Sequence, residues 1–331
     1  MPEIVLTEAA DFDFASEEYR ALLRRSRCSP FQHPDWLAPF YRTLVRSHHV
    51  EPLVIVGRAI DSGVLALVVP LVRRRTGSGF AIEYAFLGVT DYALPVIDPA
   101  TVAADDGRLA RDFLQSLGRF DRLEIAPVRQ DNLVAWRSLL PTGPAALGFG
   151  AHHVRLQSPP KSGPGLARKA RRLAERGPLK LDIAPSDEIR QTMMAARRFR
   201  RGRFQDDPMQ GEASFDFYVE VAMRDRLART YRLWCGDDLV AVLFGLVQGR
   251  RFHYLVLGCD YPRYGRFSPG MIMFARAMGH WFDGGGEIFD FTIGDETFKS
   301  ALGCERTPMY RFVQIGARAR IEPAMADRAD A

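Results

Sequence analysis

Residues 231–303 decide the fold, because they hold an unbroken series of strand, turn and helix signals. Three apolar runs come first: YRLWC (231–235), LVAVLFGLVQG (239–249) and FHYLVLGCD (252–260). They are separated by the turns Gly236-Asp237-Asp238 and Arg250-Arg251. Apolar runs between short polar turns predict a long hairpin of β-strands.

A helix with clear start and stop signals follows these strands. Ser268 is a favourable N-cap, Pro269 suits a first helical turn, and MIMFARAMGHWF (271–282) is amphipathic up to the glycines at 284–286. The next segment, EIFDFTIGDETFKSALG (287–303), predicts a short strand, a polar loop and a second helix. Strand, helix and strand make a βαβ crossover, whose helix N-terminus offers N–H groups and partial positive charge to an anion.

The N-terminal half has a similar order of elements. Apolar runs on either side of Asp61-Ser62-Gly63 predict a hairpin, and strand-like and helical runs alternate after it up to residue 140. This parallel suggests two related domains in tandem. The segment QSPPKSGPG (157–165) has the composition of a linker, so we predict domains at 1–157 and 158–331, the first a candidate scaffold.

Composition is that of a globular chain: 331 residues, 26% charged and 47% hydrophobic. The N-terminus carries acids where a secretory signal would be basic and then apolar, and the longest apolar run is too short for a membrane span. We therefore expect a cytoplasmic protein without a transmembrane segment. The cysteines are scattered and metal-ligand spacings are lacking, so we predict no metal.

Two groups of basic residues lie in the second predicted domain. One is in LARKARRLAERG (166–177) and the other in RRFRRGR (197–203). A solvated helix face explains any single arginine among them. Two groups together make a phosphate-rich ligand or an anionic surface an alternative.

Three strings carry a family resemblance: YRLWCGDDLVAVLFGLVQGRRFHYLVLGCD, RYGRFSPGMIMFARAM and FDFTIGDETFKSALG. They are similar to the C-terminal half of the CelD-like and FemAB-like acyltransferases, relatives of the GNAT N-acetyltransferases. The resemblance extends to the basic segment 166–177 and to FQHPDWLAPFYRTL (31–44). It implies an α/β (α+β) fold with mixed sheets, in which two tandem GNAT-like domains share the acyl-CoA N-acyltransferase fold.

The resemblance also implies a donor site. In GNAT-like folds acyl-CoA lies where two neighbouring strands splay apart, with its pyrophosphate on the N-terminal end of the following helix. Acetyl-CoA or another acyl-CoA would be held by Arg263, Gly265, Arg266, Ser268 and Gly270. The chain departs from the family's glycine pattern here, and Pro269 removes one N–H. FemAB-like relatives use aminoacyl-tRNA instead, so tRNA is the alternative donor.

Catalytic candidates follow from the chemistry of acyl transfer, which needs a proton acceptor and a donor to the oxyanion. In the family, the loop facing the cleft corresponds to Asp295, Glu296 and Lys299, and Asp290 ends the preceding strand. The i,i+4 spacing of 295 and 299 also fits an ordinary surface ion pair. His253 is a further candidate, with a core histidine as the competing interpretation.

Substrate-binding candidates are Arg198, Arg203 and Tyr264. The arginines could hold an acidic acceptor or a donor phosphate, and the tyrosine could donate a proton to a leaving group. Helix-end solvation and an ordinary turn tyrosine are the competing interpretations.

Three functions follow from these patterns. The first is acetyl-CoA-dependent transfer to an amino or hydroxyl group of a sugar or cell-envelope polysaccharide precursor, a small-molecule or glycan-precursor acceptor. The second is FemAB-like transfer from aminoacyl-tRNA to a peptide or peptidoglycan precursor. The third is a non-catalytic basic module that binds nucleic acid or an anionic surface.

Overall fold

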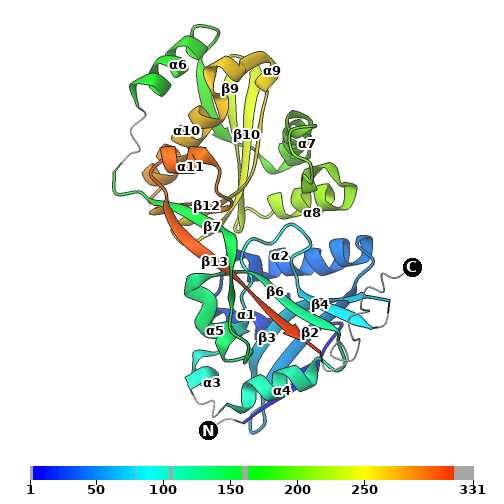
Figure 1. Ribbon diagram of the computed structural model, residues 1–331. Coiled ribbons are helices and arrows are strands. Elements are labelled where there is room, and N and C mark those ends of the chain that lie inside the picture. Colours follow the sequence, from blue (N-terminus) through cyan, green and yellow to red (C-terminus); the bar gives the residue numbers. More distant parts are fainter. Residues whose placement is uncertain (1–2, 78, 104–106, 159–162, 317–331) are drawn as a thin grey trace, which may run out of the picture. The chain divides into compact units, whose positions relative to one another are not determined.

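The computed structural model describes residues 3–77, 79–103, 107–158 and 163–316 (Figure 1). Contacts divide the chain into two compact units. The first comprises Met1–Cys28, Val45–Leu147 and Met309–Ala331, and the second comprises Ser29–Leu44 and Gly148–Pro308. The chain passes between the units at 28/29, at 44/45 and within β7 (Ala145–Arg155) and β13 (Glu305–Ile315), so these two strands belong partly to each unit. The boundary at 157/158 stays a prediction from linker composition.

The first unit is built on a mixed sheet. Its strand order is β1 (Ile4–Glu8), β2 (Glu51–Ala59), β3 (Leu65–Arg75), β4 (Phe80–Tyr84), β6 (Arg122–Arg129) and the C-terminal part of β13, with β5 (Val96–Ile97) paired to β3. β4 and β6 run parallel, and the other described pairs are antiparallel. Its helices are α1 (Glu17–Arg25), α3 (Pro99–Ala103), α4 (Arg108–Ser116), the 3₁₀ turn Gln130–Asn132 and α5 (Leu133–Arg137).

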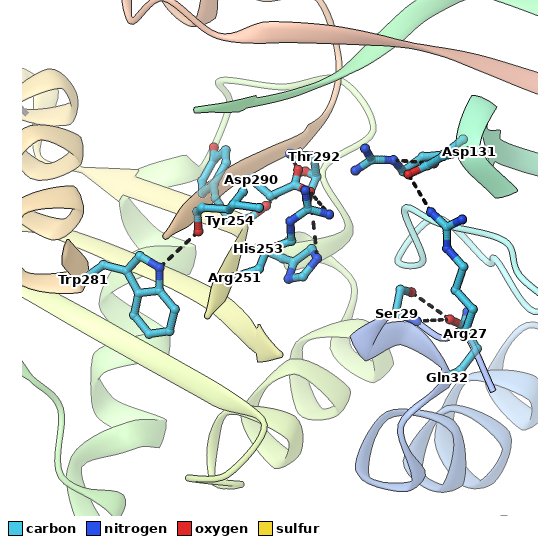
Figure 2. Close-up of polar contacts among 12 residues, drawn as sticks. Arg27, Ser29, Gln32, Asp131, Arg251, His253, Tyr254, Trp281, Asp290 and Thr292 are labelled. Carbon is cyan, nitrogen blue, oxygen red and sulfur yellow. Dashed lines mark hydrogen bonds and ion pairs between the residues drawn. The ribbon is translucent and has the colours of Figure 1, made fainter. Parts of the chain in front are cut away.

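Two large aromatic side chains pack within the mainly aliphatic core of the first unit. Tyr84 and Trp136 are almost completely buried, with ring centroids 5.9 Å apart. Their polar atoms are satisfied, because Tyr84 Oη donates to Leu94 O (3.0 Å) and Trp136 Nε1 donates to Ala93 O (3.1 Å). Arg27 and Asp131 of this unit form a solvent-exposed ion pair (2.9 Å; Figure 2).

The second unit has the strand order β7, β12 (Ile288–Ile293), β11 (Arg251–Cys259), β10 (Asp238–Gln248), β9 (Ala228–Cys235) and β8 (Leu179–Ile183). Only β11 and β12 run parallel among the described pairs of this unit. Its helices are α2 (Pro34–Pro39), α6 (Pro164–Ala174), α7 (Ile189–Arg200), α8 (Glu212–Ala222), α9 (Tyr261–Tyr264), α10 (Pro269–Asp283) and α11 (Thr297–Ala301). Short turns are Pro30–Gln32, Ser186–Glu188, Pro208–Gln210 and Gly265–Phe267, and a π-helical turn at Phe40–Val45 follows α2.

The hairpin and crossover predicted from residues 231–303 are confirmed. β9, β10 and β11 form the antiparallel strands, α10 begins at Pro269, and β12 returns parallel to β11. The mixed α/β fold class is therefore as predicted.

Helices α7 and α10 cover opposite faces of this sheet (Figure 1). A Cβ at Gly258 would lie 2.8 Å from Ala196 of α7, whereas a Cβ at Gly270 of α10 would lie 3.1 Å from Leu257 Cδ2. Neighbouring residues of a strand point to opposite faces, so Gly258 faces α7 and Leu257 faces α10.

Residues 29–44 belong to the second unit because of aromatic packing. Trp36 of α2 lies 4.8 Å from Phe217 of α8 between ring centroids, and Phe40 lies 6.3 Å from the same ring. The segment starts with a capping interaction, since Ser29 Oγ donates to Gln32 Oε1 at 2.7 Å (Figure 2).

Candidate functional site

The parallel strands β11 and β12 separate partway along their length. Their register runs only from Arg251 opposite Ile288 to His253 opposite Asp290, although β11 continues to Cys259. On the α10 face of this separation, Tyr254 packs against Phe274 (5.1 Å between centroids), and Phe274 stacks on Phe298 of α11 (5.1 Å). The second unit therefore has the splayed strand pair that the resemblance implies.

Asp290 is fully buried where the two strands part. Its Oδ1 accepts from Thr292 N (2.8 Å), and its Oδ2 lies 3.8 Å from Arg251 Nη1 and 3.9 Å from His253 Nε2 (Figure 2). Thr292 in turn donates from Oγ1 to Tyr254 O (3.0 Å), which ties β12 to β11. The structure thus brings the candidates Asp290 and His253 together.

Lys299 organises the loop after β12. The side chain is 1% exposed, and its Nζ donates to Ile293 O (2.7 Å) and Gly294 O (2.9 Å). The third acceptor is Glu296 Oε2 at 2.9 Å. Gly294 has φ +108°, and a Cβ there would lie 2.6 Å from that oxygen, so glycine permits this close approach.

Asp295 is held by residues that sequence reasoning did not select. Its Oδ1 accepts from His152 Nε2 (2.7 Å) and Gly150 N (3.1 Å). Both of its oxygens accept from Arg306, from Nε at 3.2 Å and Nη2 at 3.3 Å. These hydrogen bonds, from Arg306 first and then from His152, lower the pKa of Asp295 far below its usual value, so the carboxylate stays ionised.

Gly150 makes the approach of Arg306 possible. A Cβ at position 150 would lie 2.7 Å from both Cγ and Nε of Arg306. Because Gly150 has no side chain, Arg306 can pass close to its backbone and reach Asp295. The sequence signal for this cluster is weak, because a histidine on a strand and a distant arginine have no shared spacing.

The N-terminus of α10 is the predicted pyrophosphate cradle. Ser268 adopts φ +56° and makes no side-chain cap; its hydroxyl instead accepts from Lys169 Nζ at 2.8 Å. The N–H groups of Met271 and Ile272 both donate to Ser268 O. Tyr261 closes over the turn, since a Cβ at Gly270 would lie 3.0 Å from its hydroxyl.

Arg263 and Tyr264 are directed away from this turn. Arg263 Nη2 and Tyr264 Oη both donate to Asp238 Oδ2 at 2.6 Å, which joins the loop to the β9–β10 turn. Burial, followed by the hydrogen bond to Asp238, raises the pKa of Tyr264 to about 12. Arg266 lies over the ring of Phe267 (4.8 Å) beside Gly265.

The two predicted substrate-binding arginines are exposed and separated. Arg203 stacks on Tyr261 with its guanidinium 3.8 Å from the ring centroid, and Arg198 lies over Phe199 at 5.4 Å. Of the three substrate-binding candidates, Arg203 therefore contacts Tyr261, whose hydroxyl lies near Gly270 at the start of α10. Burial raises the pKa of the Cys259 thiol, on the same side of the sheet, to about 12, so this cysteine is not a thiolate at neutral pH.

Helix α6 presents an exposed basic surface, which we define as Arg168, Lys169, Arg171 and Arg172. Within the described ranges none of its three arginines forms an ion pair. By contrast, Arg197 and Arg200 of α7 are paired with Glu212 (2.9 Å) and Asp207 (2.8 Å).

Two further properties concern the described part of the chain. None of its groups of His, Cys, Asp and Glu side chains is arranged to hold a metal ion. None of its helices combines the length and apolar character that crossing a membrane requires.

Comparison with known proteins agrees with this geometry. Residues 165–300 match the family described as "Acetyltransferase (GNAT) domain". The whole chain is similar to the solved structure of FemX, with 11% identity, a TM-score of 0.60 and coverage of 92% of this chain and 96% of that chain. It is also similar to L-PGS from Bacillus licheniformis, with 11% identity, a TM-score of 0.58 and coverage of 93% and 94%. No curated protein matches the sequence significantly.

The splayed strand pair lies within the region that matches the GNAT domain, so the second unit has a GNAT-like fold. Residues 165–300 thus match a GNAT domain family, and the likeness to FemX shows a shared fold over 92% of this chain.

Proposed function

We propose that this protein transfers an aminoacyl group from aminoacyl-tRNA to an amino group of a peptide or peptidoglycan precursor. The observation that carries the choice of donor is the N-terminus of α10. FemAB-like acyltransferases use this donor. The solved structures of FemX and L-PGS have folds similar to that of this chain.

The first turn of α10 is a poor cradle for a diphosphate. Pro269 has no N–H, and the N–H groups of Met271 and Ile272 are bonded to Ser268 O (3.1 and 3.2 Å). Within the described chain, this leaves Gly270 as the residue of the turn whose N–H has no acceptor. A diphosphate is bound well by several convergent N–H groups, so the geometry favours a donor that does not need this cradle.

The basic surface of α6 supports a larger polyanion. Its arginines have no carboxylate partners in the described structure, and Lys169 links α6 directly to Ser268 at the start of α10. Unpaired arginines on one helix face attract phosphates at a distance and bind them on contact. A tRNA backbone would therefore meet positive charge beside the splayed strands.

The chemistry at the splayed strands is aminolysis of an ester. The attacking amine forms a C–N bond to the ester carbonyl, and the carbonyl oxygen gains negative charge in the tetrahedral intermediate. Collapse of the intermediate breaks the C–O bond, and the ribose hydroxyl leaves with a proton. Lys299 holds the loop that follows the carboxyl end of β12, the position where open α/β sheets hold ligands.

Acetyl-CoA-dependent transfer to a sugar or cell-envelope precursor is the second candidate. It is favoured by the name of the matched family and by the splay of β11 and β12, the position that acyl-CoA takes in GNAT-like folds. In that case Tyr261 must move away from Gly270 to open the turn.

Binding distinguishes the two donors. We expect uncharged tRNA to bind in a filter assay and to weaken steeply between low and high salt, because binding releases counterions from the phosphates. Calorimetric titration with acetyl-CoA should give no saturable heat. Saturable acetyl-CoA binding, with tRNA bound no better than duplex DNA of equal length, would reverse the order of the candidates.

A further inference from the structure

We propose that His152 is the proton acceptor of the transfer step and that Asp295 is the positioning residue that orients its imidazole. This inference rests on the proposed function and assigns one of its steps to a residue of β7.

The orientation of the imidazole follows from its partner. Asp295 is an ionised carboxylate, which only accepts hydrogen bonds, and its Oδ1 lies 2.7 Å from His152 Nε2. The proton of a neutral His152 must therefore sit on Nε2, which leaves Nδ1 with a lone pair. A carboxylate behind an imidazole also stabilises the imidazolium that forms when the base accepts a proton.

The lone pair on Nδ1 accepts no hydrogen bond from the described residues. The side chain of His152 is 7% exposed, and Nδ1 is buried without a hydrogen-bond partner among the described residues. A buried acceptor without a partner is unfavourable, because it has lost its hydrogen bonds to water and gained none in the protein. An incoming substrate N–H would satisfy it.

The position of His152 fits this role. It lies opposite Thr292 in the β7–β12 register, and Thr292 bonds to Tyr254 O across the splayed strands. The neighbouring His153 lies opposite Asp290 and points to the other face of the sheet.

The charges around His152 are balanced. Arg306 approaches Asp295 from β13 at 3.2 Å, and Lys299 of α11 is neutralised by Glu296 at 2.9 Å. On the opposite face, His153 lies 3.4 Å from Glu305. Asp295 is therefore the carboxylate in direct hydrogen-bond contact with His152.

The proton balance of the step is complete. As the amine nitrogen bonds to the ester carbonyl, its N–H proton moves to His152 Nδ1. The imidazolium then returns that proton to the ribose oxygen as the C–O bond breaks, so the histidine is regenerated.

The test uses the full-length protein and two readouts. Nitrogen NMR of the imidazole rings reports the tautomer, and we expect the proton of His152 on Nε2. Steady-state transfer from alanyl-tRNA to methoxyamine, a weakly basic amine that stays unprotonated at neutral pH, is then measured against pH for the wild type, His152→Gln, Asp295→Asn and His153→Gln.

We expect His152→Gln to lower kcat about 10²–10⁴-fold with little change in KM, and to lose the fall in rate at acid pH that protonation of a histidine base causes. Asp295→Asn should reduce kcat less, and His153→Gln should stay within about twofold of the wild type. Denaturation curves of the variants show whether each is folded.

Two results overturn the inference: a His152 ring protonated on Nδ1 at neutral pH, or a folded His152→Gln variant that keeps both rate and acid limb. If the wild type transfers nothing from alanyl-tRNA or from acetyl-CoA, the proposed function fails, and the base role fails with it. Normal transfer by His152→Gln removes the base role alone.

Discussion

The Nζ atom of Lys299 lies 2.9 Å from Glu296 Oε2 and also donates to the carbonyl oxygens of Ile293 and Gly294. One buried ammonium thereby fixes the loop between β12 and α11. The same loop carries Asp295, which is bound to His152 and Arg306. Two basic side chains, Lys299 and Arg306, thus hold the loop of this candidate site in place.

Replacing Lys299 by methionine should destabilise the protein by about 2–4 kcal/mol, because two carbonyl groups and Glu296 lose a charged donor at once. Urea denaturation measures this loss. The matched control is Glu296→Gln, which should lose less than about 1 kcal/mol, because Glu296 is 55% exposed and water replaces the interaction. Equal losses in the two variants would show that Lys299 is not the clamp.

Gly150→Ala should lower the free energy of unfolding by about 1–3 kcal/mol, because the new methyl group meets Arg306 at 2.7 Å and displaces it from Asp295. Gly148 lies on the same strand with nothing within 4 Å of a Cβ, so Gly148→Ala should change stability by less than about 0.5 kcal/mol. Thermal or urea unfolding of the pair gives the comparison, and similar values for both would refute the packing argument.

Charge reversal on α6 should weaken tRNA binding. We expect Arg171→Glu with Arg172→Glu to reduce affinity at least about tenfold at low salt and to flatten the salt dependence. The control is Arg111→Glu with Arg119→Glu in the first unit, which makes the same charge change at exposed arginines. Loss of binding in both double variants would mean that net charge, and not the α6 surface, holds the tRNA.

Alkaline pH should destabilise the protein through Tyr264. Its pKa is raised to about 12 in the folded chain, whereas an unfolded tyrosine ionises near pH 10. The folded state therefore holds the phenol proton more tightly, and the stability this contributes is complete below pH 10 and is lost as pH rises to about 12. Tyr264→Phe should give a shallower fall of stability over that window in urea titrations. Tyr261, whose pKa is also about 12, should leave part of the loss of stability with pH in this variant. An unchanged loss of stability with pH would show that Tyr264 does not contribute.

Local sequence patterns were sufficient to predict many of the strands and helices of the second unit. Turn residues and apolar runs predicted β9, β10, β11, α10 and β12. The spacing of Ile189, Met193 and Ala196 places them on one face of α7, and all three are buried. These features depend on contacts that are close in sequence, which period and turn chemistry report directly.

Other features depend on distant partners. Ser268 is at the N-cap position, but its hydroxyl bonds to Lys169, 99 residues away, instead of capping α10. β13 was not predicted. It pairs with β6, a strand that lies far from it in the sequence. His152 is 143 residues from Asp295, so its local sequence has no feature that marks it as a site residue.

Consumption of the donor tests the proposed function most directly. Purified protein is given alanyl-tRNA or acetyl-CoA, each labelled in the acyl group, with methylamine and with a peptidoglycan-precursor peptide as acceptors. We expect label to leave the tRNA for the amine faster than without protein, while acetyl-CoA is unchanged. Transfer from acetyl-CoA alone would contradict the proposed donor, and release from neither would contradict acyl transfer itself.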